Sequence, residues 1–286
     1  MRILVLGDLN LDIIAAEPGG LRRGDEARAP IRILPGGSAG TFARVAAASG
    51  ASVRFVGSVG NDLVGELLIR SLEDAGVEAA VVRVDQPSGA VLSLTGESER
   101  TMVCSRGAND GLRPEALAAP LFDGISHLHL SGYVFLSDAQ RPSAHRAIRM
   151  ARERNLTISV DPAPANLLET YGLDRMLDDL SSVDWLFPNL REGVVLTGIE
   201  DPEEIVAELS SRFSVGALTL GPDGALAWRK RSVDRCRSVP LDDVDPTGAG
   251  DAFCASFVVA ALRGDSLADC NRAACDTSHA YLASKS

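Results

Sequence analysis

The sequence predicts an α/β protein built on a mostly parallel β-sheet with helices on both faces. Short apolar runs, of the length and residue types of buried strands, alternate along the chain with segments that have helical spacing of apolar residues. The chain has 286 residues and 45% hydrophobic content, enough to bury one large core. We therefore expect a single domain over residues 1–286.

The expected elements follow one another in a regular order. Apolar, β-branched runs predict strands at Ile3–Leu6, Val53–Val56, Ile125–Leu130, Leu156–Val160, Val183–Phe187 and Val215–Leu220. Apolar positions three and four residues apart, often followed by a glycine, predict helices at Ser38–Ser49, Leu63–Ala75, Ala139–Arg154 and Glu203–Arg212. The last stretch, Gly248 to Leu282, predicts two helices separated by Gly264-Asp265.

Two segments, 13–34 and 77–106, interrupt this alternation. They carry turn residues and strand-like alternation but no helical period. We expect both to supply strands to a small sheet that stands off the main body, although two ordinary surface loops would fit the same pattern. An apolar face of this sheet would suggest a homodimer, and the sequence offers Val77, Val81, Val91, Leu92 and Leu94 for it.

Composition excludes several classes of protein. A net charge of −11 argues against general binding to nucleic-acid phosphates. No apolar run reaches 18 residues, and the first apolar run is too short for a signal peptide, so we expect neither a membrane span nor export. Five cysteines without a CxxC pair indicate reduced thiols in a cytoplasmic protein. Four scattered histidines, of which His127 and His129 share a strand face, do not suggest a metal cluster.

The most informative motif is the run from Asp245 to Phe253, DPTGAGDAF, directly before a predicted helix. Its small residues would expose backbone N–H groups at a helix start, which is an arrangement suited to a phosphate in transfer. Asp251 would lie in the first turn, where it could accept a proton from an attacking hydroxyl. The alternative is that Asp251 only complements the helix dipole.

Other polar runs follow predicted strands or open helices. Pro35-Gly36-Gly37-Ser38 opens a helix but lacks the GxGxxG and GK[ST] patterns, so no fingerprint supports a dehydrogenase. Asn10 and Asp12 follow the first strand, at the edge where open α/β sheets bind ligands, and Asp12 could accept hydrogen bonds from two sugar hydroxyls or simply form a turn.

Two further runs end strands in the second half of the chain. Asn189 and Glu192, in NLRE, fit either a capping box or a site that holds hydrated magnesium near nucleotide phosphates. The stretch from Thr219 to Gly224 could bind a nucleotide through backbone and hydroxyl groups, or be a plain turn.

Taken together and in this order, these runs resemble the ribokinase-like, or PfkB-type, family of carbohydrate and nucleoside kinases. DPTGAGDAF matches the family's C-terminal signature closely. The N-terminal signature is similar, with Gly36-Gly37, the Ala-rich helix, and then VGSVGNDLVG from Val56 to Gly65. NLRE matches the family's NxxE, and Thr219 to Gly224 looks like its nucleotide strand and loop. The resemblance covers nearly the whole chain.

The resemblance implies a Rossmann-like three-layer sandwich with a small β-sheet lid, and transfer of the γ-phosphoryl group of ATP to a primary hydroxyl. Asp251 would be the general base, and Gly248, Ala249 and Gly250 the anion hole. The acceptor site would be lined by Asn10, Asp12, Gly36, Gly37, Ser38, Thr41 and, from the lid, Arg106. The nucleotide site would include Asp161, Asn189, Thr219, Gly221, Gly224 and Thr247. Glu192 would hold Mg²⁺ through water.

Three departures from the family pattern bear on the substrate and on activation. Thr41 stands where the family usually has Asn, and Ser38 replaces a longer polar residue of some ribokinases, which argues against assigning ribose. Residues equivalent to Asp245 and Thr247 often form a monovalent-cation loop with a longer, Gly-containing tail, whereas this sequence stops at Ser286. The resemblance therefore leaves activation by K⁺ open.

The sequence thus predicts an ATP-dependent small-molecule kinase that acts on a sugar or sugar derivative. A nucleoside kinase on the same fold is the nearest alternative, and would need an aromatic side chain to stack on the base. A more distant alternative is a ligand-binding regulator that has lost catalysis. The intact Asp251 and Gly-Ala-Gly run argue against it, because a binding protein needs no base.

Overall fold

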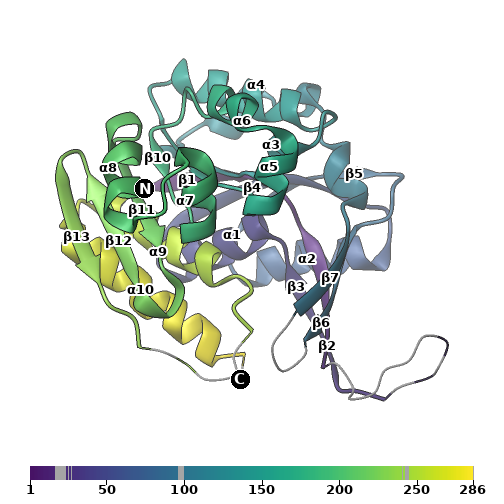
Figure 1. The fold of residues 1–286 in the computed structure, drawn as a ribbon. Coiled ribbons are helices and arrows are strands. Elements are labelled where there is room, and N and C mark those ends of the chain that lie inside the picture. The colour runs from purple at the N-terminus through teal and green to yellow at the C-terminus, as the bar shows by residue number, and fades with distance from the viewer. Residues whose placement is uncertain are drawn as a thin grey trace.

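The protein is described here from a computed structural model, which covers residues 1–16, 24, 26, 28–95, 100–239, 241 and 245–285. Within these residues the main body is a nine-stranded sheet in the order β13-β12-β11-β10-β9-β8-β1-β4-β5, with helices on both faces (Figure 1). This is the three-layer α/β arrangement that the sequence predicts, and a second, four-stranded sheet accompanies it. None of the described helices is long and apolar enough to cross a membrane.

Seven strands of the large sheet run parallel. Their short apolar sequences are buried because helices cover both sides, except at the edge strand 78–84, which is only partly buried. They are β1 (Arg2–Leu6), β4 (Ser52–Gly60), β5 (Glu78–Val84), β8 (His127–Ser131), β9 (Thr157–Asp161), β10 (Trp185–Leu186) and β11 (Val215–Thr219). An antiparallel hairpin, β12 (Ala225–Arg229) and β13 (Ser232–Cys236), continues the sheet beyond β11. Within the apolar run 183–187, only Trp185–Leu186 forms a strand, so β10 is shorter than the sequence predicts.

The helices divide between the two faces. One face carries α3 (Tyr133–Leu136), α4 (Arg141–Arg152), α5 (Ala165–Tyr171), α6 (Leu173–Asp179), α7 (Leu190–Thr197) and α8 (Pro202–Arg212). The other carries α1 (Ser38–Ala48), α2 (Leu63–Asp74), α9 (Ala249–Arg263) and α10 (Leu267–Ala283). Short 3₁₀ turns complete the described chain at Gly107–Gly111, Pro114–Ala116, Ala119–Phe122 and Gly221–Asp223.

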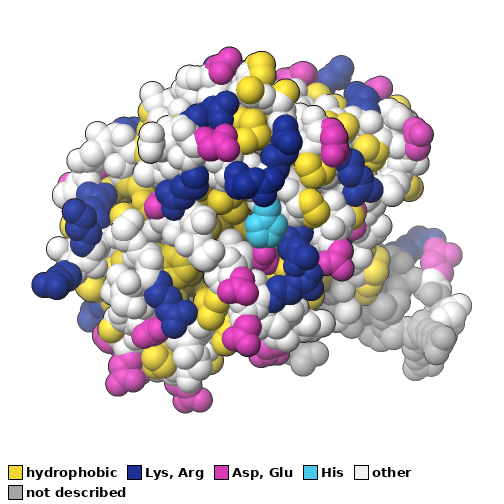
Figure 2. Space-filling model, turned by 90° about the horizontal axis from the view of Figure 1, so that it is seen from above, with side chains coloured by type: hydrophobic (Ala, Val, Ile, Leu, Met, Phe, Trp, Pro, Cys, Tyr) yellow, Lys and Arg dark blue, Asp and Glu magenta, His cyan; other side chains and the backbone are white. Residues whose placement is uncertain are grey.

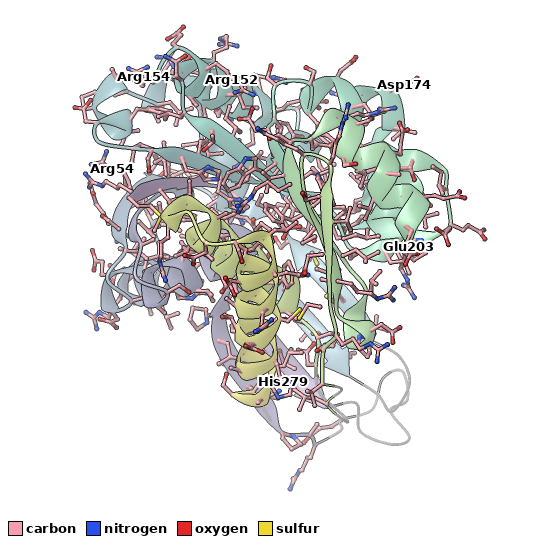
Figure 3. The ribbon with its side chains drawn as sticks, turned by 90° about the vertical axis from the view of Figure 1, so that its left-hand side faces the viewer. Arg54, Arg152, Arg154, Asp174, Glu203 and His279 are labelled. Carbon is pink, nitrogen blue, oxygen red and sulfur yellow. The ribbon has the colours of Figure 1, made fainter. Side chains whose placement is uncertain are left out.

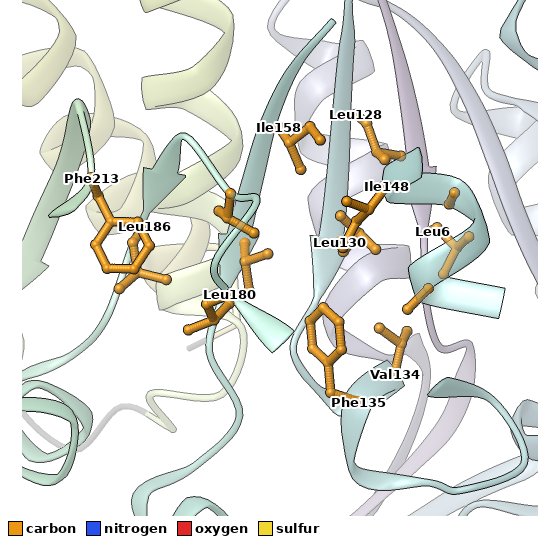
Figure 4. Packing of buried hydrophobic residues seen from close by; sticks show 14 of the residues in the cluster. Leu6, Leu128, Leu130, Val134, Phe135, Ile148, Ile158, Leu180, Leu186 and Phe213 are labelled. Carbon is orange, nitrogen blue, oxygen red and sulfur yellow. The ribbon is translucent and has the colours of Figure 1, made fainter. Parts of the chain in front are cut away.

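Each face has its own apolar cluster. Leu6, Leu128 and Leu130 of the sheet pack against Val134, Phe135 and Ile148 of the helices above them (Figure 4). On the opposite face, α9 is buried along most of its length, because α1 and α10 flank it. Seen from the side, α10 ends near His279, far from Arg152 and Arg154 at the opposite end of the molecule (Figure 3).

The small sheet has the order β3-β2-β6-β7 and projects beside the large one (Figure 1). It contains β2 (Asn10–Ala16), β3 (Ile31–Gly36), β6 (Gly89–Thr95) and β7 (Arg100–Ser105). Strand β2 pairs antiparallel with β3 and parallel with β6, and β6 pairs antiparallel with β7. The sequence places these strands in segments 13–34 and 77–106; residues 17–23, 25, 27 and 96–99 of those segments lie outside the described chain.

One expected lid strand lies elsewhere. Residues 78–84 form β5, which pairs parallel with β4 at the edge of the large sheet. Because α2 crosses over between these two parallel strands, β4-α2-β5 is an ordinary βαβ unit. Val77 is buried and Val81 packs against the core, so neither belongs to an exposed lid face.

One face of the molecule carries side chains of both charges. On the face seen from above, which includes α4, Lys and Arg side chains are interspersed with Asp and Glu, and hydrophobic side chains are scattered between them (Figure 2). Arginines of α4 and α6 form ion pairs with nearby carboxylates, as in Arg152–Asp184 and Arg175–Asp138. Such a surface suits solubility more than the binding of a polyanion.

Candidate active site

The predicted site residues gather at the carboxyl ends of the parallel strands. Asp8 follows β1, Asp161 closes β9, and Asn189 follows β10 and bridges to Thr219 at the end of β11. The first turns of α1 and α9 face this edge, since Ser38 and Asp251 are hydrogen-bonded to each other. Strand β2 leaves the same edge at Asn10, so the small sheet begins directly beside the site.

Asp251 is the centre of this cluster. Its Oδ1 accepts a hydrogen bond from Ser38 Oγ at 2.6 Å. Burial raises the pKa of Asp251 to about 7, the carboxylate of Asp8 adds to the rise, and the Ser38 hydroxyl, Arg44 and Lys285 oppose it. A carboxylate with a pKa near neutrality is a stronger proton acceptor than an ordinary aspartate and is still ionised in a useful fraction of molecules.

Asp161, at the end of β9, lies close enough to Asp251 for the charge of Asp251 to act on its carboxyl group. Burial, followed by the charge of Asp251, raises the pKa of Asp161 well above its usual range. Glu192 adds negative charge from α7, and burial raises its own pKa to about 8.

The run from Asp245 to Asp251 forms a tight turn into α9. Asp245 Oδ1 accepts hydrogen bonds from Thr247 Oγ1 at 2.5 Å and from Thr247 N at 3.1 Å. Gly248 caps the helix with φ of 79° and ψ of 0°, a left-handed conformation that favours glycine. A Cβ added to Gly250 would meet no other atom within 4 Å, so the start of α9 is open to a ligand.

The first turn of α1 is capped by Asp8. Its carboxylate accepts hydrogen bonds from Ser38 N at 3.1 Å and Asn10 Nδ2 at 3.1 Å, and Gly37 brings the chain close enough with φ of 87°. A Cβ on Gly37 would lie 2.6 Å from the backbone oxygen of Asp8. The Gly-Gly pair is thus required for the close approach of α1 to the end of β1.

Asp12 projects from β2 over Gly36. A Cβ on Gly36 would come within 2.5 Å of both carboxylate oxygens of Asp12, so only glycine fits there. Burial raises the pKa of Asp12 to about 6, and Lys285 opposes this rise. Asn10 lies at the junction of the two sheets, where its Oδ1 accepts from Asn109 Nδ2 at 2.8 Å.

The residues expected to bind nucleotide lie along the neighbouring strand ends. Asn189 and Glu192 form a reciprocal capping box at the start of α7, with Asn189 N donating to Glu192 Oε2 at 2.9 Å. After Thr219, the chain turns through Gly221 and Gly224, both at positive φ. This turn borders a hollow of about 330 Å³ lined by Pro222, Asp223, Arg235, Arg237 and Ser238.

Two expected acceptor-site residues have other contacts. Arg106 donates to Asp110 Oδ1 at 2.7 Å and to Gln140 Oε1 at 2.8 Å, which anchors the base of the lid. Thr41 is buried in α1, and its hydroxyl accepts from Arg44 at 3.2 Å. Their roles in the acceptor site therefore stay predictions.

Four residues near the site are not among those that the sequence predicts. Asp8 caps α1, and Lys285 donates to Thr247 O at 2.6 Å. Arg44 is directed back along α1 to Pro35 O, and burial lowers its pKa while the charges of Asp12 and Asp251 oppose the change. Burial raises the pKa of the Tyr133 hydroxyl, and the charges of Asp8, Asp251 and the lid residue Cys104 add to the rise. Only Asp8 stands within a motif, the run from Gly7 to Asp12.

The donor chemistry of the site suits magnesium held mainly through water. Asp161, Glu192 and Asp251 are oxygen donors, and the charge of Asp251 raises the pKa of the other two, so a cation would relieve the repulsion. In the described part of the chain, no three His, Cys, Asp or Glu side chains are grouped closely enough to hold a metal ion on their own. Mg²⁺ does not need such a group, because it usually binds one or two carboxylates together with waters and substrate phosphates.

Comparisons with known proteins agree with this geometry. The chain is 31% identical over 264 residues to the ATP-dependent ribose-1-phosphate kinase of Halopiger xanaduensis, covering 90% of this chain and 84% of that protein. It is 26% identical over 266 residues to the ribokinase of Bacillus subtilis, covering 92% of this chain and 86% of that protein.

Solved structures show the same fold. The adenosine kinase of Sinorhizobium meliloti superposes with a TM-score of 0.88 at 23% identity, covering 99% of this chain and 94% of that one. A protein assigned as ribokinase II of Escherichia coli, solved with ATP and Mg²⁺, gives a TM-score of 0.88 at 20% identity, covering 98% of this chain and 92% of that one. The model of the pfkB family of carbohydrate kinases matches residues 1–286. The chain therefore belongs to the pfkB family of carbohydrate kinases.

Proposed function

We propose that this kinase transfers the γ-phosphoryl group of ATP to a hydroxyl, most simply a primary one, of a sugar or sugar derivative, with Asp251 as the general base. The observation that carries the proposal is the environment of Asp251. Its carboxylate has a pKa of about 7 and lies in the first turn of a helix whose start is open at Gly250. A base and an anion-binding helix start side by side are what phosphoryl transfer to a hydroxyl requires.

In this mechanism, the acceptor hydroxyl displaces or joins the Ser38 hydroxyl as a donor to Asp251. Asp251 takes the hydroxyl proton as the oxygen attacks the γ-phosphorus in line with the leaving ADP oxygen. Backbone N–H groups of the Gly248–Asp251 turn then stabilise the charge on the transferring phosphoryl group.

The remaining residues position the two substrates. Asp12 accepts hydrogen bonds from hydroxyls of the acceptor. Asn10, Gly36 and Gly37 line the same site. The nucleotide lies along the turn from Thr219 to Gly224, which borders the hollow lined by Arg235 and Arg237. Asp161 and Glu192 would hold Mg²⁺ through water. Bound to the phosphates, the ion would offset their negative charge and that of the acidic site.

A panel of acceptors tests this proposal. The protein is incubated with Mg-ATP and ribose, ribose 1-phosphate, fructose, fructose 6-phosphate or adenosine, and acceptor-dependent release of ADP is measured. Phosphorylation of a sugar supports the proposal. Tyr133, an aromatic side chain near enough to Asp251 and the lid residue Cys104 for their charges to act on it, is the observation that favours adenosine as the second candidate. Binding of Mg-ATP without ADP release for any acceptor would favour a binding protein without catalysis.

We also propose that two copies associate through their lids. Ile33, Leu92 and Val103 lie in one cross-strand row of the small sheet and are 59%, 40% and 65% exposed. Ile31, 62% exposed, lies on the same face two residues from Ile33. An exposed apolar face of this kind favours association, and a monomer by light scattering at high protein concentration would refute it.

A cytoplasmic location completes the proposal, because ATP is available there and no disulfide joins any of the five cysteines.

A further inference from the structure

The end of α10 lies against the phosphate-binding turn, through side chains that the mechanism above does not use. Ser278 Oγ donates to Ala249 O at 3.0 Å, and Lys285 Nζ donates to Thr247 O at 2.6 Å. Between these two contacts, a Cβ on Gly248 would lie 2.8 Å from the hydroxyl oxygen of Tyr281. Two side chains of α10, and Lys285 just beyond its end, thus lie against three successive residues of the turn.

We propose that the Lys285 ammonium is a built-in cation of the phosphate-binding turn, which positions the Thr247–Gly248 peptide and makes a free monovalent cation unnecessary. The inference rests on the proposed function, since it assigns Lys285 a role in organising that same site. Lys285 is a positioning residue, because its contact is with the turn and not with the reacting atoms.

The peptide geometry explains how Lys285 could act. The carbonyl oxygen of Thr247 and the N–H of Gly248 belong to one planar trans peptide, so they point in opposite directions. When Lys285 holds the carbonyl toward α10, the N–H of Gly248 is turned the other way. Gly248 keeps the left-handed conformation that starts α9, and Asp245 holds Thr247 from its N–H side at 3.1 Å.

Lys285 also brings positive charge to an acidic site. It acts on the carboxylates of Asp251 and Asp12, and in both cases it opposes the rise in pKa that burial causes. Its ammonium lies 4.6 Å from the centre of the Tyr281 ring, which restrains the side chain over the turn.

The same residue links the turn to the lid. Arg32 of β3 donates a hydrogen bond to the carbonyl oxygen of Lys285. The end of α10 therefore connects a lid strand to the turn that precedes Asp251. In Figure 1, the C-terminus lies between α10 and the small sheet.

This arrangement does not fit the potassium loop that the sequence left open. A cation held by Asp245 and Thr247 would need oxygen atoms of that segment, and the carbonyl of Thr247 already binds a positive charge from the chain itself. An ammonium group carries the same charge as K⁺ and binds the same kind of oxygen atom. The Lys285 side chain thus occupies an oxygen ligand that a monovalent cation would need.

The test compares wild type with Lys285→Met, which keeps the length of the side chain and removes its charge, and with Lys285→Arg, which keeps the charge. Lys230, the other lysine of the chain, is remote in the β12–β13 turn and gives the matched control Lys230→Met. Turnover is measured in choline chloride and again with added KCl or NH₄Cl. Calorimetric affinity for a non-hydrolysable Mg-ATP analogue is measured in the same buffers.

Wild type and Lys230→Met are expected to change less than about twofold on addition of KCl. Lys285→Met is expected to lose about 10- to 100-fold in kcat, the range seen when a group that orients a charged site is removed. KCl or NH₄Cl should restore a large part of that loss and Lys285→Arg should retain most of the activity. Melting temperatures should stay within about 2 °C of wild type, because Lys285 is only partly buried and its replacement leaves no cavity in the core.

Three results would overturn the inference: strong activation of wild type by K⁺, normal turnover of Lys285→Met in choline buffer, or a loss in that variant that neither K⁺ nor NH₄⁺ reverses.

The binding measurement separates failure of this inference from failure of the proposed function. If no acceptor is found, the binding measurement alone tests the role of Lys285. Equal affinity of wild type for the Mg-ATP analogue with and without K⁺ then supports that role. A wild type that binds no nucleotide refutes the proposed function itself.

Discussion

Replacing Asp251, the proposed general base, with Asn should make the folded protein more stable, and the gain should be largest at high pH. Burial raises the pKa of Asp251 from 3.8 to about 7. A carboxyl group whose pKa is higher in the folded protein binds its proton more tightly there than in the unfolded chain. Its contribution to stability is therefore complete below the unfolded pKa and is lost as the pH rises through the folded pKa.

The size of the effect follows from the same values. With about 1.4 kcal/mol for each pKa unit, the change from 3.8 to about 7 is worth about 4 kcal/mol, lost between about pH 4 and pH 8. Asp251→Asn cannot ionise and so avoids this cost. Asn pairs less strongly with Ser38, and the site is partly open to water, so we expect a net gain of about 1–3 kcal/mol at pH 8. For a chain of this size, that is a rise of about 2–6 °C in melting temperature.

The assay is thermal unfolding of wild type and Asp251→Asn at pH 4 and pH 8, in EDTA and without nucleotide. The variant should melt at a higher temperature at pH 8, and the difference should shrink toward zero at pH 4, near the pKa of the unfolded carboxyl, where the folded and unfolded chains differ little in protonation. Asp123→Asn, which changes an exposed carboxylate on the far side of the sheet, is the control and should show no such pH dependence. An equal difference at both pH values, or a less stable variant at pH 8, would refute the reasoning.

Two further substitutions separate the phosphate site from the acceptor site. Gly250→Val places a side chain in open space where a phosphate should contact backbone N–H groups. Turnover should therefore fall while the melting temperature stays nearly unchanged. A melting temperature that falls together with activity would show that Gly250 is only a packing residue. Asp12→Ala should lower kcat/KM for the acceptor by about 10- to 1000-fold and leave the KM for ATP nearly unchanged, with Asp12→Asn milder, because buried hydroxyls lose an acceptor worth about 1–3 kcal/mol each. Acceptor kinetics that do not change in Asp12→Ala would remove Asp12 from the site.

Local sequence patterns identify most elements of the large sheet but not which sheet a strand joins. Residues 78–84 have the alternation of a lid strand, yet they form β5, because the choice depends on pairing with β4 and not on local sequence. The β12–β13 hairpin cannot be predicted from local sequence for a different reason. Its turn contains Lys230 at φ of 57°, a conformation usually marked by Asn or Gly, so the sequence carries no turn signal there.

Part of the site can likewise be predicted from local sequence, and part cannot. Glycine-rich motifs directly before a helix identify the region of Asp251 and that of Gly36–Gly37. Asp8, Arg44, Tyr133 and Lys285 come to the site from four separate elements, and each is an ordinary residue within its own segment. Lys285 is the clearest case, since it lies 38 positions from the carbonyl that it binds. Only the packing of α10 beside α9 brings the two together.

The most direct test of the account is the steady-state turnover of Asp251→Asn with Mg-ATP and the best acceptor from the panel, at a pH where wild-type Asp251 is ionised. Loss of a general base should lower kcat by about 10²–10⁴-fold and leave the KM for ATP within about tenfold of wild type. Near-normal kcat in this variant would contradict the assignment of Asp251 as the base, and with it the mechanism proposed for this kinase.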